Sequence, residues 1–146
     1  MRISKNYKMR EFSVSSSFPH LATGVPKEFQ CNVVNLVLAL LQPINDATGW
    51  SNYISSGYRS PMLNSRVGGS PSSQHLKGEA SDNNFYYYQN GKKISVTPYE
   101  VAKKVKWLNL DFDQMILYPT FIHLSFKVGA NRRQVLYSST YKGKRL

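Results

Sequence analysis

The sequence FIHLSF, residues 121–126, has the two-residue alternation of a β-strand with one apolar face. Ile122, Leu124 and Phe126 fall on the same face of that strand, and His123 falls on the opposite face. We expect the apolar face to pack against the interior of the protein, since one buried face is typical of strands in antiparallel sheets. His123 therefore faces a different space, away from the core.

Helical and extended patterns surround this strand. A helix is predicted to begin at Pro26, and its apolar positions recur at helical spacing to Ile44, with a bend or break near Pro43. Thr97-Pro98-Tyr99-Glu100 is a capping box that predicts a second helix. Further strands are predicted at residues 53–56, 85–88, 93–96, 114–118 and 134–137, and residues 57–73 read as an ordered surface loop. The pattern predicts an α+β fold with a central antiparallel β-sheet and helices packed on one side.

The length and composition fit one globular domain. With 146 residues, of which 41% are apolar, residues 1–146 are expected to form a single domain with a basic tail at about 138–146. No apolar run follows the basic N-terminus, and the longest apolar stretch, residues 33–41, is too short to span a bilayer. We therefore expect no membrane span, and synthesis in the cytoplasm without a signal peptide. Cys31 is the only cysteine, which excludes an internal disulfide.

The formal net charge is +11, from 19 Lys and Arg against 8 Asp and Glu, so non-specific binding to polyanions is expected. Basic residues cluster densely only in the tail, and none of the short nucleic-acid signatures is present. Sequence-specific binding to nucleic acid is therefore the weakest of the functions considered. An anionic bacterial cell wall is an equally good partner for the same charge.

Two histidines and one aspartate are candidate metal ligands. Gly78 and Ala80 lie between His75 and Asp82 and let the backbone fold tightly enough to bring the two together, and His123 adds a third group from its strand. A catalytic zinc ion takes three such protein ligands and keeps an open position for water. His20 lies in a serine-rich loop without comparable neighbours. A lone histidine on a strand is more often a structural residue than a ligand, so spacing alone leaves both interpretations open.

Four segments carry a resemblance to a known family. They are Ser73-Gln74-His75-Leu76-Lys77-Gly78-Glu79-Ala80-Ser81-Asp82, residues 56–60 with Leu63-Asn64, residues 112–114 with 122–126, and residues 131–136. Together they resemble the zinc D-Ala-D-Ala carboxypeptidase and L-alanyl-D-glutamate endopeptidase family, which shares its fold with the hedgehog signalling domain. The last segment is similar to the end of its small, phage-associated branch. The resemblance extends from about residue 3 to residue 137.

The resemblance implies roles for individual residues. His75, Asp82 and His123 match the ligands of the family's zinc ion, Zn²⁺. Arg59 matches the arginine that helps to hold substrate and to stabilise the oxyanion of the tetrahedral intermediate, although it also reads as a loop residue paired with a surface acid. Ser73 is expected to orient the ligand loop by hydrogen bonding, because no histidine is spaced as a partner that would make it a nucleophile.

One expected residue is absent. Active relatives carry a glutamate a few residues before the last histidine, where it takes a proton from the zinc-bound water, and residues 117–122 contain no acid. Asp113 is the best candidate for the base, but it is equally plausible as a hydrogen-bond acceptor for a zinc-bound histidine. Tyr118 lies near the expected position and is a candidate donor to an oxyanion. The other carboxylates from which a protein base could come are Glu79, Glu100 and Asp111.

The resulting hypothesis is a zinc-dependent peptidase that hydrolyses peptide bonds in bacterial peptidoglycan. Carboxypeptidase and endopeptidase specificities are both open. An endolysin-like, phage-encoded enzyme is expected, which reaches the wall after lysis, by holin release or as part of a virion. The alternative is a catalytically silent zinc domain of the same fold that binds cell-wall peptide or a protein partner.

Overall fold

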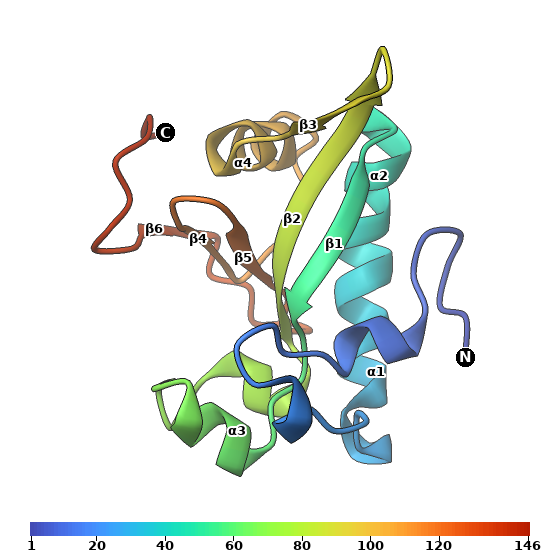
Figure 1. The fold of residues 1–146 in the computed structure, drawn as a ribbon, viewed down its shortest axis with the longest axis vertical. Coiled ribbons are helices and arrows are strands. Elements are labelled where there is room, and N and C mark those ends of the chain that lie inside the picture. The colour runs from blue at the N-terminus through green and yellow to red at the C-terminus, as the bar shows by residue number, and fades with distance from the viewer.

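The computed structural model describes residues 1–146 and has an α+β fold built on one six-stranded sheet, as predicted (Figure 1). The strand order is β1-β2-β5-β4-β6, and β3 pairs with β2. The strands are β1 (Ser51–Ser56), β2 (Ala80–Gln89), β3 (Lys92–Ser95), β4 (Gln114–Leu117), β5 (Ile122–Ser125) and β6 (Gln134–Tyr137). The helices are α1 (Lys27–Leu36), α2 (Gln42–Thr48), α3 (Pro61–Arg66) and α4 (Pro98–Trp107), with short 3-10 helices at Met9–Phe12, Pro19–Leu21 and Gln74–Lys77.

The sheet departs from the prediction at one strand pair. All its pairs are antiparallel except β4 with β6, which are parallel. The chain reverses direction between β4 and β5 and again before β6, so β6 runs in the same direction as β4. Because β6 occupies the free edge of β4 rather than that of β5, this pair must be parallel.

The first helical segment is continuous but changes its hydrogen bonding before Pro43. A π-helical turn, Val37–Leu41, joins α1 to α2, and the N–H of Gln42 donates to the carbonyl of Val37, five residues earlier. Pro43 has no N–H to donate, so the regular pattern cannot continue through it. The predicted irregularity is therefore present as a π turn, and Figure 1 shows the resulting long column beside β1 and β2. None of the helices combines the length and apolar character needed to cross a membrane.

The predicted hairpin and second helix are both present. Asn90 and Gly91 have φ values of 52° and 77°, so both central residues of the β2–β3 turn are left-handed, as a type I′ hairpin turn requires. The hydroxyl of Thr97 accepts a hydrogen bond from the N–H of Glu100 at 3.2 Å and caps α4. These local signals were sufficient to predict both elements.

One hydrophobic core joins α1, α2 and α4 to one face of the sheet. Ile122 and Leu124 of β5 belong to it, as predicted from their alternation, together with apolar residues of α1, α2, α4 and β4. Tyr7 and Tyr141 belong to the same core, so both ends of the chain pack against it. His123 lies on the opposite side of β5, where the rest of the site is assembled.

Residues 57–73 are more regular than predicted, because they contain α3. The hydroxyl of Ser60 accepts a hydrogen bond from the N–H of Leu63 at 3.2 Å, and Pro61 occupies the first turn. This is the same serine or threonine cap followed by proline that begins α4, but here the surrounding turn-forming residues obscured it. In Figure 1, α3 lies beyond the end of β1, away from α2 and α4.

Candidate metal centre

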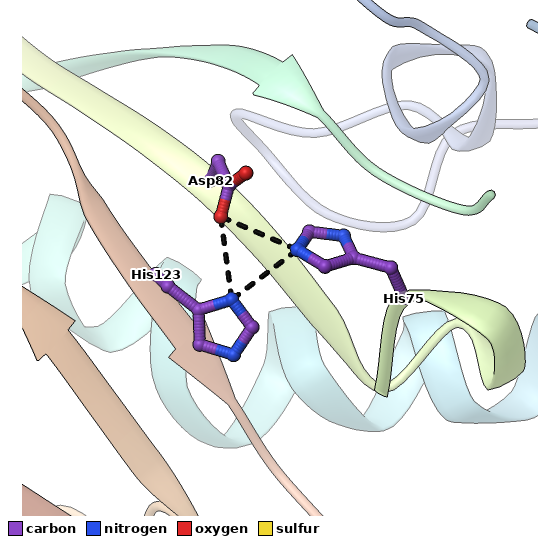
Figure 2. A group of neighbouring side chains, drawn as sticks. All are labelled: His75, Asp82 and His123. Atoms are coloured by element: carbon purple, nitrogen blue, oxygen red, sulfur yellow. Dashed lines mark hydrogen bonds and ion pairs between the residues drawn. The ribbon is translucent and has the colours of Figure 1, made fainter. Parts of the chain in front are cut away.

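His75, Asp82 and His123 converge on one point (Figure 2). The Nε2 atom of His75 lies 3.2 Å from Nδ1 of His123, and each of these nitrogens lies 3.3 Å from Oδ1 of Asp82. Asp82 on β2 is directly opposite His123 on β5 in the sheet register, so strand pairing places two of the three groups side by side. His75 reaches them from the 3-10 helix Gln74–Lys77.

His75 is held in place by its own 3-10 helix and by residues of the segment that follows β1. The hydroxyl of Ser73 accepts a hydrogen bond from the His75 N–H at 3.3 Å. The His75 carbonyl accepts from the N–H of Arg59, and Gly78 ends the helix at φ 70°. The Nδ1 atom of the His75 ring lies 2.7 Å from the carbonyl oxygen of Gly57. Since a carbonyl only accepts, Nδ1 carries the proton and Nε2 presents its lone pair to the site.

The three groups fit a zinc ion in both chemistry and spacing. Zinc binds imidazole nitrogen and carboxylate oxygen at about 2.0–2.2 Å, so tetrahedral ligand atoms are about 3.3–3.6 Å apart. The observed separations of 3.2–3.3 Å among His75, Asp82 and His123 match this spacing. Three atoms that offer lone pairs repel one another at such distances unless a cation or a proton lies between them.

Burial sets the ionisation of the site. Burial raises the pKa of Asp82, but the two neighbouring histidines outweigh it and hold the pKa of this carboxyl well below its usual range. Burial is also the main reason why the pKa of His123 is lowered. Asp82 is therefore ionised and His123 neutral at neutral pH. These are the forms in which aspartate and histidine bind metals.

Arg59 lies beside this group, as the family resemblance implied. Its Nη2 atom is 3.6 Å from Oδ2 of Asp82, and it also contacts the side chains of Ser56 and Asn64 at 3.3 Å. The side chain is 15% exposed, and burial lowers its pKa while Asp82 opposes that effect. Arg59 is therefore paired with a buried carboxylate at the site and not with a surface acid.

An open cavity of about 450 Å³ lies over the three groups. Arg59, Arg132 and Tyr118 contribute to its walls, and serine and glycine residues of the loop before His75 form part of its rim. Asp82 is the only carboxylate that lines it. The cavity therefore has the three candidate metal ligands at its floor and cationic and hydrogen-bonding groups in its walls, but it holds no acid that is free to act as a base.

Tyr118 lines the cavity and its ring stacks on Phe121, with 4.4 Å between the centroids. Burial raises the pKa of its hydroxyl, the negative charge of Asp82 raises it further, and Arg59 opposes both. The phenol therefore stays protonated at neutral pH. It is suited to donate a hydrogen bond and not to accept a proton from water.

Asp113 does not line the cavity, and its carboxylate is already occupied. It accepts three hydrogen bonds from Arg132, at 2.8–2.9 Å, and one from the side-chain amide of Gln74. Its pKa is lowered to about 2, chiefly by the hydrogen bonds from the Arg132 side chain. A carboxylate so strongly stabilised in its charged form is a poor base at neutral pH.

The expected contact between Asp113 and a candidate ligand histidine is also absent. The far nitrogen of His75 bonds to Gly57, and the far nitrogen of His123 is buried without a partner. The other candidate carboxylates, Glu79, Glu100 and Asp111, do not line the cavity either.

Three contributors to the site were not anticipated. Gln74 and Arg132 line the cavity, and the carbonyl of Gly57 orients His75. Gln74 and Gly57 lie within the segments that carried the family resemblance, but a side-chain amide and a backbone carbonyl have no motif of their own. Arg132 is brought to the cavity by Asp113, which lies 19 residues earlier in the chain.

Two histidines and an aspartate gathered beneath an open cavity are suited to hold a metal ion of the kind that activates water in hydrolases. A scan against models of protein families matches residues 6–125 to Peptidase M15, and the chain belongs to this family. The matched range includes His75, Asp82 and His123 and ends before Arg132. A comparison with curated protein sequences finds no match. Membership in a peptidase family supports a peptidase function.

Proposed function

We propose that the protein is a zinc-dependent peptidase that hydrolyses peptide bonds in bacterial peptidoglycan. The observation that carries the proposal is the convergence of His75 Nε2, Asp82 Oδ1 and His123 Nδ1 at separations of 3.2–3.3 Å beneath an open cavity. These three residues would hold the zinc ion. When bound, zinc lowers the pKa of a water molecule to about 7 and polarises the carbonyl that is attacked.

In this proposal the protein's own residues bind the substrate and stabilise the negative charge that develops during hydrolysis. Gly57 fixes the ring of His75, so that its Nε2 lone pair faces the site. Arg59 is held by Ser56 and Asn64 on the wall of the cavity, where it can bind a substrate oxygen. Tyr118 lines the cavity and stays protonated, so it would donate a hydrogen bond to the oxygen that becomes negative during hydrolysis.

The charge of the chain favours an anionic substrate. The net charge is +11, and two of the basic residues, Arg59 and Arg132, line the cavity. Peptidoglycan stem peptides carry free carboxylates, so their charge complements this cavity. The similarity of residues 131–136 to the phage-associated branch supports an endolysin-like role, in which the enzyme reaches the wall after lysis, by holin release or within a virion.

One observation favours a second candidate function. Asp82 is the only carboxylate in the cavity and is also a candidate metal ligand, so no separate acid is available to accept a proton from water. A zinc domain that binds cell-wall peptide, or a protein partner, without cleaving it needs no such base. This candidate uses the same cavity and the same three ligands.

Digestion of soluble muropeptides with mass analysis separates the two functions. We expect the zinc-loaded protein to release defined fragments, chelation to stop release, and added zinc to restore it. Fragment masses identify the bond that is cleaved. If the protein at saturating zinc binds muropeptides but releases no fragment from any of them, the peptidase proposal fails and the binding domain takes its place.

A further inference from the structure

Arg132 and Gln74 are fixed on one buried carboxylate at the edge of the cavity. Asp113 is 1% exposed and accepts from the N–H, Nε and Nη2 of Arg132 and from the side-chain amide of Gln74. Both donors line the cavity, whereas Asp113 itself does not. Asp113 is therefore an anchor that holds two polar side chains in place on a wall of the site.

The arrangement leaves specific hydrogen-bonding atoms free. Arg132 uses Nε and Nη2 on Asp113, which leaves the Nη1 edge of its fork without a protein partner, and 55% of its side chain is exposed. The Oε1 atom of Gln74 is buried and has no partner either. Arg132 therefore has a free donor edge and Gln74 an acceptor without a partner, and Asp113 holds both side chains in place.

Arg133, the next residue, differs from Arg132 in its surroundings. It pairs with Asp111 and Asn109, both outside the cavity, and Asp111 is 62% exposed. The two arginines have similar exposure, 55% and 45%, and each is paired with an aspartate. Only Arg132 has a buried anchor that directs it to the site.

We propose that Arg132, positioned by Asp113, recognises a carboxylate of the peptide substrate and so selects acidic peptides. Guanidinium groups bind carboxylates through paired N–H donors, and a fork already fixed by a buried anchor loses little further freedom on binding. The inference rests on the proposed function and names its substrate class.

Arg59 is less suited to this recognition. Its fork is shared among Asp82, Ser56 and Asn64, and its partner Asp82 is itself a candidate metal ligand. Asp113 remains ionised throughout the neutral range, so Arg132 stays anchored wherever the enzyme works. The two arginines therefore have different roles: Arg59 lies beside the candidate metal ligand Asp82, and Arg132 is free to bind a substrate carboxylate.

The test measures affinity separately from turnover. Stem peptides released from peptidoglycan, with carboxylates either free or converted to amides, are titrated calorimetrically into the zinc-loaded protein, and kcat and KM are measured where cleavage occurs. We expect Arg132→Gln to weaken binding of the free-carboxylate peptide by about 10- to 100-fold, the range of a charged hydrogen bond, with zinc content unchanged. The amidated peptide should bind both proteins equally. Arg132→Lys keeps the charge without the fork and should recover part of the loss.

Arg133→Gln is the matched control and should bind both peptides like the parent protein. Because Arg132→Gln leaves a buried carboxylate unpaired, Asp113→Asn/Arg132→Gln is measured as well; it removes both charges and should show the same selective loss in a folded protein. Equal effects of Arg132→Gln and Arg133→Gln, or equal losses for free and amidated peptides, overturn the proposal. A parent protein that binds but does not cleave refutes the peptidase function alone, since recognition is still read from the titration.

Discussion

His75 and His123 are 48 residues apart in the chain, yet their ring nitrogens approach to 3.2 Å. His123 is placed by strand pairing with β2, and His75 by the carbonyl of Gly57 and the short helix that begins after Ser73. The two rings are therefore oriented by different contacts, His123 by strand pairing and His75 by hydrogen bonds. Both rings present a nitrogen to Asp82, as a shared metal ion requires.

Removal of either histidine should abolish zinc binding. We expect the parent protein to hold about one zinc ion per chain and His75→Ala or His123→Ala to lose it, because two remaining ligands bind zinc too weakly. Metal analysis after dialysis measures the content. His20→Ala is the control, since His20 is exposed on a separate 3-10 helix. Full zinc occupancy in either site variant would refute the ligand assignment.

The hydroxyl of Tyr118 is expected to act in turnover and not in metal binding. Tyr118→Phe removes one donor from the cavity wall and keeps the ring that stacks on Phe121. We expect kcat to fall by about 10²–10³-fold, the range for loss of one oxyanion donor, with zinc content unchanged. Tyr88→Phe, at a 67% exposed tyrosine outside the cavity, should have no effect. An unchanged kcat in Tyr118→Phe would remove the phenol from the mechanism.

At the scale of elements, the ligand-bearing 3-10 helix depends on a glycine at its end. Gly78 has φ 70°, and a Cβ atom there would lie 3.1 Å from the carbonyl oxygen of Phe29 and from a methyl group of Val33. The residue that ends the helix is therefore packed directly against α1. This contact couples the position of His75 to the helix that forms much of the core.

Gly78→Ala should destabilise the protein by about 2–3 kcal/mol, of which about 1–2 kcal/mol comes from the left-handed backbone and the rest from the close contacts with α1. Zinc affinity should fall with it, because the displaced helix carries His75. Gly129→Ala is a matched control: Gly129 has φ 71° and open space around it, so only the backbone term applies. Urea unfolding and zinc titration measure both effects. Equal destabilisation by the two variants would show that the packing contact is unimportant.

At the scale of the whole molecule, the Asp113–Arg132 pair ties the segment before β6 to the sheet. The backbone of Asp113 also bonds to Ser125 of β5 and Gln134 of β6, so this residue connects three strands. Its carboxyl has a pKa lowered from 3.8 to about 2 in the folded protein. Its stabilising contribution is therefore present above pH 4 and is lost as the pH falls through 2.

The free energy of unfolding of the parent protein should exceed that of Asp113→Asn by about 1–2 kcal/mol at pH 5, a value reduced by the exposure of Arg132. The difference should shrink towards zero at pH 2, because protonation of Asp113 removes the same charge as the substitution. Urea unfolding of both proteins between pH 2 and pH 5 measures it. A difference that does not change with pH would mean that the ion pair does not stabilise the fold.

The net charge of +11 predicts a salt-dependent affinity for anionic walls. Adhesion of the protein to purified cell walls should weaken steeply between low and physiological salt, because exposed charges are screened over about 8–10 Å at physiological ionic strength. Binding of a short stem peptide in the cavity should change less, since it depends on fixed contacts at Arg132 and Arg59. Wall adhesion that is insensitive to salt would instead indicate recognition through a specific pocket.

Local sequence by itself determined most elements of the fold. The alternation in residues 121–126, the Asn90-Gly91 turn and the Thr97 cap each report on a few neighbouring residues, and all three predictions are confirmed. The helix α3 was missed, although Ser60-Pro61 carries the same kind of cap, because turn-forming residues surround it. The three candidate ligands were also recognisable, since His75 and Asp82 lie in one short motif and the strand alternation turns His123 away from the core.

Only the tertiary structure decided how the rest of the site is assembled. The contact of Asp113 with Gln74 spans 39 residues, its contact with Arg132 spans 19, and the contact of His75 with Gly57 spans 18. A carboxylate in the sequence does not reveal which donors will surround it. Asp113 therefore read as a candidate base, whereas folding surrounds it with Arg132 and Gln74 and fixes it in the charged form. The physical reason is that hydrogen-bond partners and burial, which set the pKa and reach of a side chain, are properties of packing between distant segments.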